Sequence, residues 1–134
     1  MLAIVIQART GSNRLPNKML LPFHSSKGVL ELLLEKLCNR FNNLPIIVAT
    51  TTNNIDDRIV ELCLKNKINY FRGSENNVLK RYFECAKYYR LKNIIRITSD
   101  CPLVDPQIIT KMIKEYMKSR LDYFSNTMVP TFPD

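Results

Sequence analysis

A chain of 134 residues in which 46% of the side chains are apolar is long enough to fold as one globular domain with a buried core. Its 20 lysines and arginines outnumber its 12 aspartates and glutamates, and the net charge of +8 favours an anionic partner such as a nucleic acid, a membrane surface or a phosphorylated small molecule. No stretch approaches the roughly 20 apolar residues of a membrane-spanning helix, and the apolar start of the chain is too short for a signal peptide. We therefore expect a soluble, cytoplasmic protein with no membrane partner.

The cysteines and the single histidine indicate neither a metal site nor a nucleophilic catalytic site. Cys38, Cys63, Cys85 and Cys101 lie far apart and lack the C-x-x-C spacing of zinc and dithiol sites. We expect no metal bound through sulfur and at least three buried, reduced thiols. His24 is expected to be a loop residue, and no Ser-His-Asp or Cys-His arrangement can be built from it.

Short apolar runs rich in β-branched residues alternate along the chain with segments that have apolar residues at helical spacing. The short runs predict strands at residues 2–6, 45–50, 69–71, 94–98 and 122–125. The helical spacing predicts helices at about 27–41, after Asn54, at about 76–89 and after Asp105. Ser25 or Ser26 is expected to cap the first helix, and Asp105 followed by Pro106 to begin the last one.

Strands that alternate with helices predict right-handed crossovers and a mostly parallel sheet, which is a three-layer α/β/α sandwich formed by a single domain of residues 1–134. Asp56 and Asp57 fall in the first turn of the second helix, where the helix dipole favours negative charge. The expected buried face of the third helix consists of Val78, Leu79, Tyr82, Phe83 and Ala86. Ligands of such sheets bind beyond the carboxyl ends of the strands, so the segments after Ile6, Ala49 and Ile97 should converge on one crevice.

The segment from Gln7 to Lys18 directly follows the first predicted strand and holds three cations, Arg9, Arg14 and Lys18. The small residues Gly11 and Ser12 would let the backbone approach a polyphosphate and donate N–H groups to it, while the cations supply charge-assisted hydrogen bonds. The pattern is neither G-x-x-x-x-G-K-[ST] nor G-x-G-x-x-G, which excludes an ordinary P-loop and a dinucleotide-binding motif. On the pattern alone, a solvated basic loop is an equal alternative.

A second candidate site lies at residues 96–103, where Asp100 follows a predicted strand and precedes Pro102. A carboxylate just beyond the end of a strand is well placed to hold Mg²⁺. The alternative is that Asp100 is a turn residue or a helix cap. A cation-rich loop at one strand end and a carboxylate at another are together the parts that phosphoryl-type transfer requires.

The loop at residues 7–20 resembles the signature loop of the cytidylyltransferases that activate acidic sugars, such as those that make CMP-acylneuraminate and CMP-octulosonate. Residues 71–75, 78–82, 96–103 and 122–127 also resemble the spore-coat polysaccharide biosynthesis subfamily, so the resemblance covers nearly the whole chain. It implies a fold like that of the nucleotide-diphospho-sugar transferases and transfer of CMP from CTP to a sugar, with release of pyrophosphate. The implied cofactor is Mg²⁺, the implied partners are CTP and a sugar acceptor, and a homodimer is left open.

The resemblance also implies roles for individual residues. Arg9, Lys18 and Asp100 would be catalytic, with Asp100 as the Mg²⁺ ligand. The implied nucleotide-binding residues are Ala8, Arg9, Gly11, Ser12, Arg14, Lys18, Thr50, Arg72 and Thr98. Arg81 either reaches the site from its helix or braces Glu75, and bracing is favoured because arginines on helix surfaces mostly have structural roles.

Members of this family are usually longer, with a second metal-binding carboxylate and much of the sugar pocket and dimer surface in the later part. We therefore expect this chain to be truncated, and a nucleotide-binding module of the same fold without turnover is an alternative function. A nucleic-acid binder would need a contiguous basic face with exposed aromatic residues. The cations here are dispersed, and Tyr82, Phe83, Tyr88 and Tyr89 are expected in or beside the core, so we expect no nucleic-acid partner.

Overall fold

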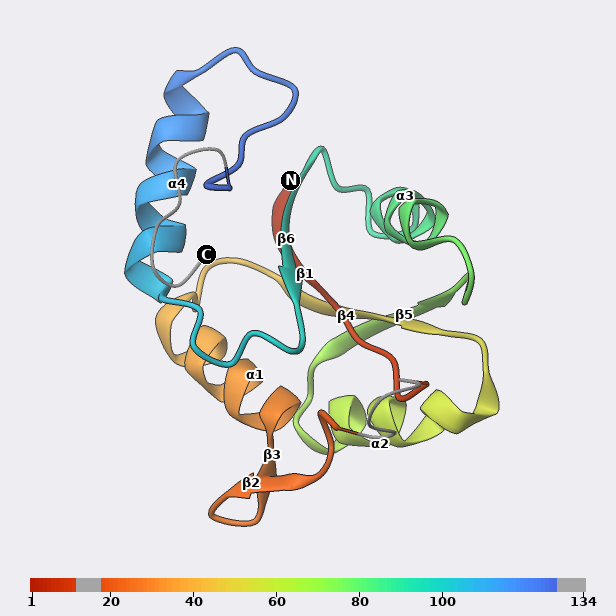
Figure 1. Ribbon diagram of the computed structural model, residues 1–134. Helices are drawn as coiled ribbons and strands as arrows, with labels where there is room; N and C mark the ends of the chain where they lie inside the picture. The colour runs from red at the N-terminus through yellow and green to blue at the C-terminus, as the bar shows by residue number, and fades with distance from the viewer. Residues whose placement is uncertain (12–17, 128–134) are drawn as a thin grey trace. The chain divides into compact units, whose positions relative to one another are not determined.

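The computed structural model describes residues 1–11 and 18–127, and the chain forms two compact units that meet in sequence after Pro102. In chain order the elements are β1 (Leu2–Gln7), β2 (Pro22–His24), β3 (Lys27–Gly28), α1 (Val29–Arg40), β4 (Ile46–Thr51), the 3₁₀ helix η1 (Asn54–Asp56), α2 (Asp57–Lys65), β5 (Asn69–Gly73), α3 (Val78–Tyr88), β6 (Asn93–Thr98) and α4 (Pro106–Lys118) (Figure 1). The first unit contains every strand, and the second contains α4. Among the described helices, none has the length and apolar character needed to cross a membrane.

The first unit is built on a four-stranded parallel sheet with the strand order β5-β4-β1-β6. Helices α1 and α2 lie on one face of this sheet and α3 on the other, which confirms the predicted three-layer α/β/α sandwich (Figure 1). The chain adds strands on one side of β1 and then returns to the other side, so the strand order reverses between β1 and β6. Parallel sheets bind ligands at this kind of switch point, outside the carboxyl ends of the strands.

The core is formed by strands that are buried on both faces, as expected for a parallel sheet with helices on both sides. One core cluster consists of Ala3, Val5, Ile47, Ala49, Tyr82 and Cys85. The four buried residues of α1 are Leu30, Leu33, Leu34 and Leu37. The predicted alternation of strands and helices is therefore confirmed, because the apolar runs and apolar helix faces meet as their periods require.

The prediction that Ser25 or Ser26 caps α1 is wrong. Both serines have positive φ angles, 50° and 63°, and they form the turn of an antiparallel hairpin, β2 and β3, that was not predicted. The N-cap of α1 is Gly28, which provides no side-chain hydrogen bond. A Cβ at this glycine would lie 2.7 Å from the carbonyl oxygen of Met19, so the chain needs glycine here. Leu30 donates its N–H to the same Met19 oxygen at 3.0 Å, which satisfies one of the free helix donors.

The predicted buried face of α3 is partly wrong. Leu79 and Phe83 are 80% and 67% exposed, and Val78 is also exposed. The residues that α3 buries are instead Arg81, Tyr82 and Cys85. The helix is therefore rotated by about one residue from the predicted face, so that Arg81 lies on the buried side and Leu79 and Phe83 do not.

The fifth predicted strand, at residues 122–125, is wrong, because the structure has a bend at Asp122 and no regular secondary structure at 123–125. Phe124 instead packs against Tyr116 of α4, with a distance of 6.4 Å between the ring centroids. The predicted start of α4 is confirmed, since the carboxylate of Asp105 accepts a hydrogen bond of 2.7 Å from the N–H of Gln107.

The prediction of at least three buried thiols is wrong, because Cys38 and Cys101 are only partly buried. Cys63 and Cys85 are fully buried, and all four thiols are free. Burial raises the pKa of Cys63 to about 12 and that of Cys85 to about 11. Both buried thiols therefore stay protonated at neutral pH and behave as small apolar side chains.

Candidate functional site

The three loops expected to converge begin side by side at one edge of the sheet. Gln7, the last residue of β1, pairs with Ala49 of β4 and with Thr98 of β6. Just beyond it, the N–H of Ala8 donates to the carbonyl oxygen of Ala49 at 3.2 Å, and the N–H of Ser99 donates to that of Gln7 at 3.1 Å. The predicted convergence of the three segments is therefore confirmed where each loop begins, and a crevice between them stays a prediction.

Two of the predicted catalytic residues contact each other across this edge. Nζ of Lys18, which follows the β1 loop, lies 2.9 Å from Oδ2 of Asp100, which follows β6. The hydrogen bond from Lys18 lowers the pKa of Asp100 and the hydroxyl of Thr98 lowers it further, although burial opposes both. The Asp100 carboxylate is therefore ionised at neutral pH, and about half of its side chain is exposed.

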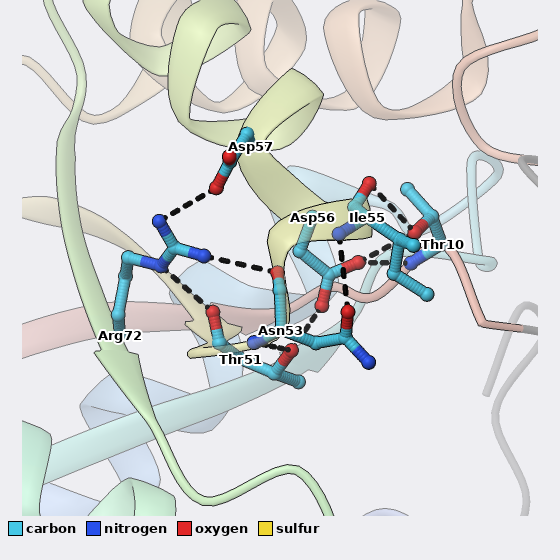
Figure 2. Close-up of polar contacts among 7 residues, drawn as sticks. All are labelled: Thr10, Thr51, Asn53, Ile55, Asp56, Asp57 and Arg72. Atoms are coloured by element: carbon cyan, nitrogen blue, oxygen red, sulfur yellow. Dashed lines mark hydrogen bonds and ion pairs between the residues drawn. The ribbon is translucent and has the colours of Figure 1, made fainter.

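The β1 loop is held in place by a buried carboxylate that the sequence analysis did not recognise as part of the site. Oδ1 of Asp56 accepts a hydrogen bond of 2.7 Å from the N–H of Thr10 and one of 2.6 Å from its hydroxyl (Figure 2). The hydroxyl of Thr51, at the end of β4, donates to Oδ2. Asp56 is 1% exposed, so burial acts to raise its pKa, but the hydrogen bonds from Thr10 and Thr51 outweigh burial and lower it.

This arrangement makes Asp56 a charged anchor rather than only a residue in the first turn of a helix. It ties the loop after β1 to the end of β4, and its partner Thr10 stands directly beside Arg9 in the sequence. The sequence signal for this role is a hydroxyl residue at the end of a strand, Thr51, followed within a few residues by an aspartate. The interaction of Asp56 with the helix dipole already explained this aspartate without a distant partner, so the contact with Thr10 was not predicted.

Arg72, which was assigned to the nucleotide by resemblance, uses its guanidinium within the protein. Nε donates to the carbonyl oxygen of Thr51 and Nη2 to that of Asn53, both at 2.9 Å, and Nη1 lies 2.7 Å from Oδ1 of Asp57 (Figure 2). These contacts fasten β5 to the segment that carries Asp56. A contact between Arg72 and the nucleotide stays a prediction.

The other assigned residues lie at different depths. Arg9 is exposed directly after β1, while Ala8 beside it is 2% exposed. Thr50 is completely buried in β4, and its hydroxyl has no hydrogen-bond partner in the described part of the chain. The hydroxyl of Thr98 lies 3.2 Å from Sγ of Cys101, next to Asp100.

Gly11 is partly buried, and a Cβ there would lie 3.5 Å from Cδ1 of Ile55, which is an ordinary contact. The described geometry therefore does not itself require glycine at this position. Ser12 and Arg14 lie outside the described residues.

The described residues contain no group of three or more histidine, cysteine, aspartate or glutamate side chains that could hold a metal ion. Among these residues Asp100 belongs to no such group, so it would contribute one carboxylate. This donor set suits Mg²⁺, which proteins commonly hold through one or two carboxylates together with phosphate oxygens of the substrate and water. It does not suit a metal that needs a complete cage of protein ligands.

The chain thus has a cation-bearing loop and a carboxylate that meet at the switch point of a parallel sheet, and its sequence matches a known protein family. The family model described as cytidylyltransferase matches residues 3–133. The chain belongs to the cytidylyltransferase family. The resemblance that was based on the β1 loop is thereby confirmed.

Two similar sequences and one similar solved structure agree with this family assignment. The uncharacterized protein MJ1063 of Methanocaldococcus jannaschii is 46% identical over 121 residues, covering 90% of this chain and 49% of the relative. The spore coat polysaccharide biosynthesis protein SpsF of Bacillus subtilis is 34% identical over 123 residues, covering 89% of this chain and 51% of the relative. The solved structure of a cytidylyltransferase from Leptospira borgpetersenii serovar Hardjo-bovis matches with a TM-score of 0.82 and 41% identity, covering 89% of this chain and 50% of that one. The chain thus spans about half the length of these relatives.

Proposed function

We propose that this protein transfers CMP from CTP to a sugar, with release of pyrophosphate, in the biosynthesis of a surface or spore-coat polysaccharide. The observation that carries the proposal is the contact between Lys18 and Asp100 at the switch point of the sheet, in a chain of the cytidylyltransferase family. The similarity to a protein named for spore coat polysaccharide biosynthesis supports a sugar as the acceptor.

In the proposed reaction an oxygen of the acceptor attacks the α-phosphorus of CTP in line. The new bond joins this oxygen to the α-phosphorus, the bond to the pyrophosphate oxygen breaks, and the proton of the acceptor hydroxyl passes to solvent. Arg9 and Lys18 would bind phosphate oxygens and stabilise the charge that develops on the departing pyrophosphate. Most of the rate enhancement would then come from positioning and charge neutralisation.

We propose Asp100 as the residue that holds Mg²⁺, which when bound neutralises phosphate charge. The lowered pKa of this carboxyl keeps it ionised at neutral pH, and its exposure leaves it accessible. Lys18 would then exchange its contact with Asp100 for one with a phosphate oxygen. This exchange costs little, because an ion pair between exposed groups stabilises a protein by at most about 1 kcal/mol.

A second candidate is a module that binds CTP without turning it over. It is supported by the absence, among the described residues, of any group of three or more side chains that could hold a metal ion. The two candidates share a nucleotide site and differ in whether pyrophosphate is released.

Two measurements on one preparation separate these possibilities. Titration calorimetry with CTP, with and without Mg²⁺, tests for the nucleotide site. A pyrophosphate-release assay with saturating CTP and a panel of acidic and amino sugars then tests for transfer. Binding with release supports the transferase, binding without release supports the module, and the absence of any CTP binding would overturn both.

A further inference from the structure

Arg81, in the first turn of α3, is one of the largest fully buried side chains of the described chain, with 1% of its surface exposed. Arginine is rarely buried to this extent unless it is paired with an acidic group. Here Nη1 donates to the carbonyl oxygen of Ser74 at 2.7 Å, and Nε is buried with no hydrogen-bond partner among the described residues. Within this part of the chain, the carbonyl oxygen of Ser74 is the acceptor that holds the side chain.

Bracing of Glu75, which the sequence favoured for Arg81, is not what the geometry provides. The ion pairs found among the described residues do not include Arg81. Oε2 of Glu75 instead accepts a hydrogen bond of 3.1 Å from the side-chain amide of Asn53. Hydrogen bonds alone therefore do not account for the burial of Arg81. Its positive charge also acts on the charged groups near it.

The position of Arg81 is fixed by the carboxyl ends of β5 and β4. A Cβ on Gly73, the last residue of β5, would lie 3.1 Å from Cγ of Arg81, so the arginine packs directly over this strand end. Gly73 pairs with Thr51, whose hydroxyl bonds Asp56. Asp56 in turn holds Thr10, the neighbour of Arg9 in the chain. A continuous series of contacts therefore links Arg81 to the β1 loop.

The charges around Arg81 are arranged in a consistent way. Burial lowers its pKa most and the positive charge of Arg9 lowers it further, while Tyr82 and the negative charges of Asp56 and Glu75 raise it. Two cations and two carboxylates thus share one region, with one cation buried and Arg9 exposed. Both carboxylates already accept hydrogen bonds from neutral groups, so neither needs the guanidinium of Arg9 as a donor.

We propose that Arg81 is a positioning residue, whose buried charge balances Asp56 and Glu75 and thereby leaves the exposed Arg9 free to bind a phosphate group of the nucleotide. The proposal deepens the proposed function and rests on it. Without Arg81, the two carboxylates would attract Arg9 more strongly. The repulsion between the positive charges of Arg81 and Arg9, which keeps Arg9 away from the carboxylates, would also be lost. A loop cation that already pairs with a carboxylate binds phosphate less well, because that pair must first be broken.

A double-mutant cycle tests this mechanism, with CTP affinity measured by calorimetry for the parent, Arg9→Ala, Arg81→Met and the double variant. We expect Arg81→Met to weaken CTP binding by about fivefold or more in the parent, and by less than about twofold when Arg9 is already alanine. Lys80→Met is the matched control, because it removes one positive charge from an exposed position of the same helix, and it should change the affinity by less than about twofold. An equal loss from Arg81→Met in both backgrounds would overturn the proposal.

Arg81→Lys covers the case in which Arg81→Met does not fold, since it keeps the charge at the buried position. A folded Arg81→Lys protein should bind CTP within about threefold of the parent, because the mechanism depends on charge rather than on the fork geometry of the guanidinium. A loss as large as that of Arg9→Ala would contradict the mechanism. If the parent protein bound no CTP, the proposed function itself would fail. If the parent bound CTP but Arg9 and Arg81 showed no coupling, only the proposed role of Arg81 would fail.

Discussion

Lys18 and Asp100 lie 82 positions apart in the chain, yet Nζ of the first is 2.9 Å from Oδ2 of the second. The contact joins the loop after β1 to the loop after β6, which are the two strand ends at the switch point. Because about a third of Lys18 and half of Asp100 are exposed, the contact contributes little to folding and can exchange for a ligand. The pair is therefore expected to matter for binding far more than for stability.

Replacing Lys18 by alanine should weaken CTP binding by about 1.5 to 3 kcal/mol, the range for a hydrogen bond to a charged group. The free energy of unfolding should change by less than about 1 kcal/mol, because the lost ion pair is exposed. Calorimetry and urea denaturation measure the two quantities on the same protein. Unchanged CTP affinity in a folded Lys18→Ala variant would remove Lys18 from the site.

Asp100→Asn keeps the shape of the side chain and removes its charge. If Asp100 holds Mg²⁺, CTP affinity should increase with Mg²⁺ in the parent and much less in this variant. Asp105→Asn is the control, because asparagine caps a helix about as well as aspartate, and its Mg²⁺ response should match that of the parent. An equal Mg²⁺ response in the Asp100→Asn protein would return Asp100 to the role of a turn residue.

Thr10→Val should destabilise the protein by about 1 to 3 kcal/mol, because it removes a hydroxyl donor from the buried carboxylate of Asp56. Thr10→Ser keeps the donor and should recover most of this loss. Urea denaturation of the three proteins at neutral pH provides the comparison. A valine variant as stable as the parent, with the serine variant destabilised, would show that the methyl group, and not the hydrogen bond, is what matters at this position.

The lowered pKa of Asp56 also predicts an acid dependence of stability. The folded pKa lies below the unfolded value of about 3.9, so the stabilisation is fully present above the unfolded pKa and is lost as the pH falls through the folded pKa. Asp56→Asn should therefore show a smaller loss of stability than the parent between about pH 4 and the folded pKa. Parallel pH profiles for the two proteins would mean that Asp56 does not carry this dependence.

Arg72→Met should lower the free energy of unfolding by about 1 to 3 kcal/mol, because it removes a charged donor from the carbonyl oxygens of Thr51 and Asn53, although the Asn53 oxygen keeps the N–H of Asp56. CTP affinity of the folded variant should fall less than it does in Lys18→Ala, since the guanidinium is used within the protein. The same two assays measure both effects. A large loss of affinity with unchanged stability would instead support direct contact between Arg72 and the nucleotide.

The sequence determined the layers of the fold and the edge of the sheet at which the candidate site lies. Apolar runs and helical spacing are local properties of the chain, and parallel strands necessarily bring their carboxyl ends to one edge. For this reason the convergence of the loops after β1, β4 and β6 can be predicted, and the sequence alone places Lys18 and Asp100 beyond two of these strands. The hairpin at Ser25 and Ser26 escaped prediction because its strands are only two or three residues long.

Tertiary structure alone decided which polar groups are buried and which partners they find. Asp56 is 46 positions from Thr10, and the rotation of α3 that buries Arg81 depends on the room above Gly73. Neither contact has a local signature, since an aspartate in a first helical turn and an arginine on a helix read as ordinary surface residues. Burial of a charge is possible only where the surrounding fold supplies hydrogen bonds or opposite charges, and that supply is fixed when distant segments pack together.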